Sequence, residues 1–205
     1  MSHLYAFFLA VVLGIVLGFD ASNPRQRLAA AIFAGTVTTM FGASALYNRV
    51  TWSPRWRPWM RRLDHSMMYL SIAGMYTPFG LLVLSGAWSW LVLGVVWGGA
   101  AGAIALKFAW TDAPKWVAAA LGASLGWVGV VALPLVLARI GPGGLALLLT
   151  SGVFYTAGGI VYALRRPDPS PAVFGYHEIF HALVILGVAC QYALVAFFVL
   201  GLPPR

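Results

Sequence analysis

Seven long apolar runs, separated by short polar breaks, constrain this chain more than any other feature of its sequence. The runs cover residues 4–19, 28–48, 66–86, 87–110, 116–140, 145–164 and 179–201. About 20 apolar residues in a helix cross the hydrocarbon of a bilayer, and a chain in lipid must bond its backbone polar groups internally. The pattern therefore predicts an all-α, polytopic membrane protein built as a seven-helix transmembrane bundle.

Little of the chain remains for anything outside the bilayer. Hydrophobic residues make up 61% of the 205 residues and charged residues only 9%, against about 25% charged in an average soluble domain. Seven spans take about 140 residues, which leaves roughly 65 for all loops and tails. We expect a single domain over residues 1–205, with any chemistry inside the bilayer or at its edge. The short first run is interpreted as a span rather than a signal peptide, because no Lys or Arg precedes it.

Basic residues mark one side of the predicted bundle. The breaks on that side carry nine Lys and Arg residues, and those on the other side carry four, namely Arg25, Arg27, Arg139 and Arg205. Because Lys and Arg in short loops favour the cytoplasmic side, we expect the N-terminus inside and the C-terminus outside. The net charge of +8 would suggest nucleic acid for a soluble protein, but here it predicts anchoring to the membrane surface.

The break from Arg49 to Arg62 has the composition of an interfacial segment. It interleaves three tryptophans with arginines, and both residue types gather at the headgroup level of a bilayer. We expect anionic lipid headgroups to bind at Arg55, Arg57, Arg61 and Arg62.

Small residues recur at helical spacing in the middle of the chain. Gly94, Gly98 and Gly102 form one stripe, and Gly122 and Gly126 form another. Such stripes let helix backbones approach closely in lipid. We interpret them as packing within one bundle, with homodimerisation as the alternative.

Polar residues near the ends of three spans indicate a site. His177 and His181 open the seventh span, Asp64 opens the third, and Ser44 and Asn48 close the second. Ionisable side chains at membrane depth cost free energy, so each is treated first as a candidate functional residue. Residues at i and i+4 lie on one face of a helix. By the orientation above, all three segments converge at the cytoplasmic edge, and the two histidines suit a metal ion.

Each of these residues also has a simpler explanation. Asp64 could cap the third helix, His177 could face water at the interface, and Ser44 could be a small packing residue. His65 should point about 100° away from Asp64 on a helix. His3 is left out of the predicted site.

Residues 177–181 also fit the His-Glu-x-x-His pattern of zinc metalloproteases, in which the glutamate activates a metal-bound water. Intramembrane metalloproteases carry this pattern in an early span, whereas here it lies in the last one. We therefore keep a protease only as a minor alternative, in which Glu178 is essential.

Several stretches together resemble the haemolysin III family, the bacterial branch of the progestin and adipoQ receptor family. The similar stretches are Phe41–Asn48, Leu63–Tyr69, Ile72–Phe79 and His177–His181. The resemblance implies seven helices with the N-terminus inside, and a place in the bacterial inner membrane. It also implies a zinc ion near the cytoplasmic face, held by one histidine late in the second helix and two in the seventh.

The same resemblance assigns roles to residues of this chain. His177 and His181 match the two later zinc ligands, Asp64 matches an aspartate that holds the metal-bound water, and Ser44 matches a signature serine. Asn48 stands where the family has its first histidine. A neutral amide oxygen is a poor zinc ligand beside imidazole, so zinc could be held with a changed ligand set, held weakly, or lost.

The resemblance implies a zinc-dependent hydrolase acting on a lipid amide, of the ceramidase type. Zinc would lower the pKa of a bound water, and Asp64 would take its proton. A non-enzymatic membrane-homeostasis or sensor protein with a degenerate metal site is the alternative. A pore-forming haemolysin is a further one, although no stretch looks able to convert from a water-soluble to an inserted form.

Overall fold

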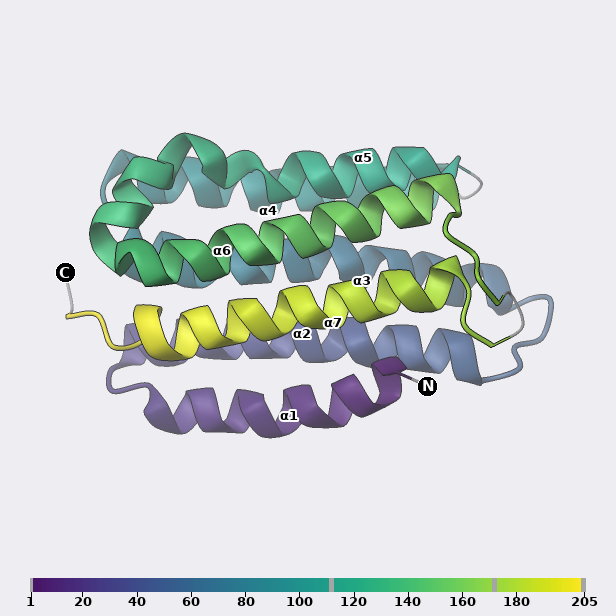
Figure 1. The fold of residues 1–205 in the computed structure, drawn as a ribbon, viewed down its shortest axis with the longest axis horizontal. Coiled ribbons are helices and arrows are strands. Elements are labelled where there is room, and N and C mark those ends of the chain that lie inside the picture. The colour runs from purple at the N-terminus through teal and green to yellow at the C-terminus, as the bar shows by residue number, and fades with distance from the viewer. Residues whose placement is uncertain (1, 111–112, 171–172, 204–205) are drawn as a thin grey trace.

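The computed structural model describes residues 2–110, 113–170 and 173–203, and within them it is entirely helical apart from short connections. Figure 1 shows the long helices lying side by side along the long axis of the molecule. In chain order they are α1 (Ser2–Asp20), α2 (Pro24–Arg49), α3 (Arg57–Pro78), α4 (Ala87–Ala109), α5 (Lys115–Gly126), α6 (Leu133–Leu164) and α7 (Tyr176–Leu194). The all-α prediction is confirmed.

Two turns at the same end of the bundle contain residues that favour a turn or the start of a helix. The side chain of Asn23 caps α2 by accepting a hydrogen bond from the backbone N–H of Gln26, and Pro24 occupies the first turn, where its missing N–H costs nothing. Gly86 precedes α4 with φ of 58°, a conformation that glycine adopts without strain. The third and fourth apolar runs are therefore separated by a tight turn at Gly86.

Proline and glycine shape the longest helical segments. Pro78 ends α3, and the chain continues as a π-helical turn, η1 (Phe79–Val83). After α5, a 3₁₀ turn, η2 (Val128–Ala132), leads into α6. Inside α6, Gly141 has φ of 69° and ψ of 178°, which reverses the chain.

This reversal decides how the spans are counted. Among the residues that the structure describes, six segments are long and apolar enough to cross a membrane, and one of them, Lys115–Leu164, has 50 residues. Its two arms meet at Gly141 and lie side by side, as Figure 1 shows. A seventh crossing therefore depends on this one segment crossing twice.

Apolar side chains both fill the bundle and cover it. One buried cluster includes Tyr69, Val96 and Val136, and a second includes Phe33, Val188 of α7 and Val195 of η3 (Val195–Val199). Large apolar side chains also lie fully outside, with Trp90 78% and Phe197 77% exposed. Apolar surface of this extent is what a lipid-facing helix bundle presents.

The expected packing of the first glycine stripe is wrong. A Cβ atom added at Gly94, Gly98 or Gly102 would meet nothing within 4 Å, so this stripe of α4 faces outward. The close helix approach lies elsewhere: a Cβ at Gly74 on α3 would fall on the side chain of Thr36 on α2. Gly74 therefore sets the spacing between these two helices.

The basic breaks gather at one end of the bundle. Figure 1 shows α2, α4 and α6 ending where α3, α5 and α7 begin, and the start of α1 points toward the same end. The C-terminus and the reversal at Gly141 lie at the opposite end.

Candidate functional site

A large cavity runs through the interior of the bundle. It has a volume of about 720 Å³. Arg61 and Tyr76 of α3 both line it, and 15 positions on a helix correspond to about 22 Å. Its wall therefore extends through much of the thickness of a bilayer.

The two ends of this cavity differ in chemistry. Toward the basic end it is lined by polar side chains from four helices, namely His3, Ser44, Asn48, Asp64, His65, His177 and His181. Toward the other end it is lined by Phe79, Leu84, Val92, Ala132 and Val136. We call the first group the polar end and the second the apolar end of the cavity. Such a shape suits a molecule with a polar head and an apolar chain.

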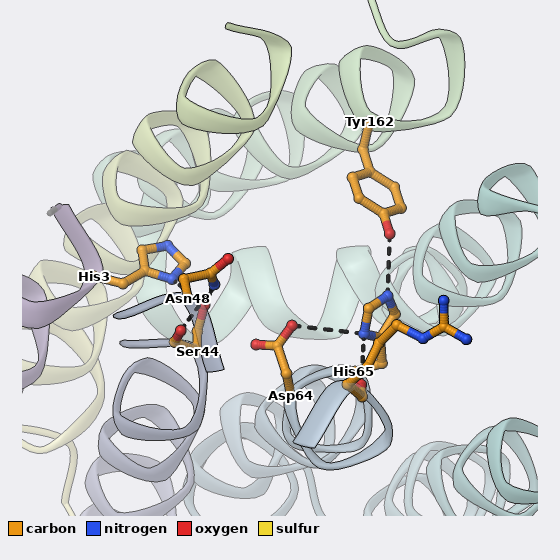
Figure 2. A network of polar contacts seen from close by, with 7 residues as sticks. His3, Ser44, Asn48, Asp64, His65 and Tyr162 are labelled. Carbon is orange, nitrogen blue, oxygen red and sulfur yellow. Dashed lines mark hydrogen bonds and ion pairs between the residues drawn. The ribbon is translucent and has the colours of Figure 1, made fainter. Parts of the chain in front are cut away.

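Ser44 connects two neighbours at the polar end. The Asn48 amide Nδ2 donates to the backbone oxygen of Ser44 at 2.8 Å and contacts its hydroxyl oxygen at 3.3 Å. On the other side, the ring nitrogen Nδ1 of His3 lies 2.8 Å from the Ser44 hydroxyl oxygen. Figure 2 shows His3, Ser44 and Asn48 grouped together, with Asp64 between this group and His65. Ser44 therefore has specific polar partners and is more than a small packing residue.

His3, which the sequence did not single out, lies at the polar end of the cavity. His3 is only 6% exposed, and its ring stacks on that of His181 with centroids 3.6 Å apart and planes inclined by 14°. The ring of His181 lies 4.3 Å from that of His177. Three imidazoles from the first and last helices thus form one row. In the sequence, His3 is only a histidine that precedes an apolar run. Histidines at a membrane surface have the same position, so this pattern did not distinguish His3 from them.

Asp64 and His65 both face the cavity, contrary to the expected separation. His65 Nδ1 lies 3.5 Å from an oxygen of Asp64, and Figure 2 shows this contact. The same nitrogen is 2.8 Å from the backbone oxygen of Arg61, so it carries the proton, because a carbonyl oxygen only accepts. His65 Nε2 then accepts from the Tyr162 hydroxyl at 3.1 Å. The cavity is therefore wide enough for two adjacent residues on different faces of α3 to line it.

Asp64 is not a helix cap. α3 begins at Arg57, seven positions earlier, so Asp64 lies in its third turn. The capping explanation is therefore wrong, and the carboxylate is held in the cavity wall instead.

Glu178 has a local structural role. Its carboxylate accepts a hydrogen bond from the backbone N–H of Gly175 at 3.0 Å, in the first turn of α7. It does not appear among the described residues that line the cavity. This position gives no support to a protease in which Glu178 would activate water.

Lys115 and two tyrosines lie beside the histidines. The Lys115 ammonium donates to the Tyr176 hydroxyl at 2.5 Å and lies 4.8 Å from the centre of the Tyr162 ring. All three line the cavity, as do Arg61 and Lys107. The two tyrosines could not be predicted from the sequence, because no spacing rule connects them to residues on other helices.

The polar end fits zinc in the type of its donors but not in a ready-made geometry. Among the residues that the structure describes, no three His, Cys, Asp or Glu side chains are arranged to hold a metal ion. Asn48 is turned toward Ser44. His3, His177 and His181 nevertheless supply three adjacent imidazoles, the donors of many catalytic zinc sites. His3 Nε2 is buried without a hydrogen-bond partner, as a nitrogen available to a metal would be.

The fold and the cavity define an integral membrane protein of the polytopic helical class, with an interior chamber that is polar at one end. Sequence comparison gives the family. The profile of the family described as Haemolysin-III related matches residues 1–192, and the chain belongs to this family.

Two bacterial relatives support this assignment. A protein named Hemolysin-3 homolog from Bacillus subtilis (strain 168) is 26% identical over 194 residues, which cover 95% of this chain and 88% of the relative. A protein named Hemolysin-3 from Bacillus cereus is 33% identical over 138 residues, which cover 67% of this chain and 60% of the relative. No solved structure matches the chain.

Proposed function

We propose that this chain is a zinc-dependent hydrolase of a lipid amide, with its reaction at the polar end of the cavity. The observation that carries the proposal is that histidines, a carboxylate and an apolar chamber share one cavity of about 720 Å³. An acyl chain would lie against Phe79 and Val92, and its amide would lie near Asp64. The family resemblance adds the reaction class.

Each polar residue at this end of the cavity would have a separate role in the reaction. His177 and His181 would hold zinc, which, when bound, polarises a carbonyl group and lowers the pKa of a water. The Asp64 carboxylate would hold the attacking water and accept its proton. Ser44 would orient its neighbours through the hydrogen bonds to Asn48 and His3. The apolar walls would keep bulk water from the amide, which strengthens polar interactions there.

The same proposal includes a topology and a location. The segment Lys115–Leu164 would cross the membrane twice, through its reversal at Gly141, which makes seven crossings. The basic end would face the cytoplasm of a bacterium, with the protein in the inner membrane. There Arg55 and Arg57 are exposed in the loop before and at the start of α3, where anionic headgroups can reach them together with Arg61 and Arg62.

One observation favours a second candidate function. The position of the family's first histidine is occupied by Asn48, whose amide is bonded to Ser44 rather than turned outward. A chain that binds its lipid without cleaving it would act as a sensor of membrane state. Both candidate functions use the same cavity, but only the hydrolase would cleave the bound lipid.

The test is release of fatty acid from ceramide by the purified protein in mixed micelles. We expect release that stops with a zinc chelator and with Asp64→Asn. Ceramide binding without release, in protein loaded with zinc, would contradict the hydrolase and support the sensor. Dye leakage from protein-containing liposomes that persists after His177→Ala/His181→Ala would instead support a pore.

A further inference from the structure

His3 has the environment of a metal ligand. Its two ring nitrogens differ: Nδ1 is hydrogen-bonded to the Ser44 hydroxyl, and Nε2 is buried without a partner. Histidines that bind metals almost always use the second nitrogen for a hydrogen bond of this kind, which fixes the ring and its tautomer. A buried polar atom with no partner otherwise loses its hydration without compensation.

His65, in the same cavity, shows the contrasting case. Its Nδ1 bonds the Arg61 backbone oxygen and its Nε2 bonds the Tyr162 hydroxyl. Both nitrogens are therefore occupied, and the ring has nothing left for a metal. Burial in this cavity does not by itself leave a histidine nitrogen unpaired.

The position of His3 also places it beside the two histidines of α7. Its ring centroid is 3.6 Å from that of His181, and the ring of His181 is 4.3 Å from that of His177. α1 brings this ring to α7 from the opposite end of the sequence, and both helices line the cavity there. The rings are stacked in this structure, so binding one ion requires them to turn.

We infer that His3 is the third protein ligand of zinc, in place of Asn48. The inference rests on the zinc ion of the proposed function and assigns its missing donor. Asn48 and His3 bond the same serine, so His3 occupies the neighbourhood of Asn48 and offers an imidazole nitrogen there. Three imidazoles with an open fourth position form a common catalytic zinc site.

The experiment measures zinc per protein by mass spectrometry after purification in mild detergent with zinc and removal of the excess. We expect about one zinc per wild-type chain and at least a tenfold weaker affinity for His3→Ala, since ligand loss removes a direct bond. His65→Ala is the matched control and should keep its zinc. The double variant His3→Ala/Asn48→His should regain zinc, which also shows that the His3→Ala chain folds.

X-ray absorption at the zinc edge provides a readout independent of activity. We expect three imidazoles around zinc in the wild type and two in any zinc retained by His3→Ala. Wild-type zinc with two imidazoles, unchanged in His3→Ala, would overturn the role of His3 and leave the zinc hydrolase standing. If neither the wild type nor Asn48→His holds zinc, the proposed function and this inference fall together.

Discussion

The imidazole rings of His3 and His181 lie face to face, with centroids 3.6 Å apart and planes inclined by 14°. This contact joins the first helix of the bundle to the last at the polar end of the cavity. α1 otherwise packs mainly on α2, and most of its apolar side chains face outward. A helix that is mostly unburied therefore contributes a side chain to the polar end of the cavity.

Asp64→Asn should abolish hydrolysis and leave the fold intact. The amide has nearly the shape of the carboxylate but cannot accept a proton from water, and a general base contributes about 10²–10⁴-fold. We expect kcat for ceramide to fall at least 100-fold. The measurement is fatty acid release, with zinc content checked on the same sample. A variant with full zinc and near wild-type turnover would contradict the role of Asp64.

Removal of zinc should lower thermal stability as well as activity. A ligand that binds only the folded state stabilises it, by about 2.7 kcal/mol when its concentration is 100 times its Kd. We expect a chelator to lower the Tm of the wild type in detergent. The variant His177→Ala/His181→Ala should start at a lower Tm and show no further change. A chelator effect of equal size in both proteins would show that it acts elsewhere.

Gly74→Ala should destabilise the bundle, whereas Gly98→Ala should not. A Cβ at Gly74 would fall within 3 Å of the Thr36 side chain, while a Cβ at Gly98 meets nothing within 4 Å. Overpacking of this kind costs about 1–3 kcal/mol. Thermal melts of both variants measure the difference. Equal melting temperatures would mean that α2 and α3 move apart without cost.

Single cysteines should show that the two ends of the bundle face opposite sides of the membrane. The background is Cys190→Ser, which removes the one native thiol. Ser53→Cys lies in the connection between α2 and α3, and Ser85→Cys lies in the connection before α4. We expect a membrane-impermeant maleimide to label Ser85→Cys in intact cells. Ser53→Cys should react only after permeabilisation, and the reverse pattern would contradict an N-terminus inside.

Much of the architecture was predictable because it depends on local chemistry. A helix must bond its own backbone in lipid, so the apolar runs alone gave an all-α bundle, and Pro and Gly marked its breaks. The i, i+4 spacing brought His177 and His181 to one face of α7.

Specific contacts between helices could be predicted from the sequence only in part. The sequence predicted that Ser44, Asp64 and the α7 histidines would meet at one end of the bundle, since helix ends gather there. It could not predict that His3 would stack on His181 or that Tyr162 would bond His65. These contacts depend on how each helix is rotated about its axis, and on which helices are neighbours.

The sequence by itself determined the membrane class, the helices, their breaks and the family signature around His177. The tertiary structure decided that the first helix contributes His3 to the cavity wall, that the first glycine stripe faces outward, and that one cavity joins polar and apolar ends. The physical reason is that periodicity fixes which residues share a face of one helix. Packing among all the helices fixes what each face meets.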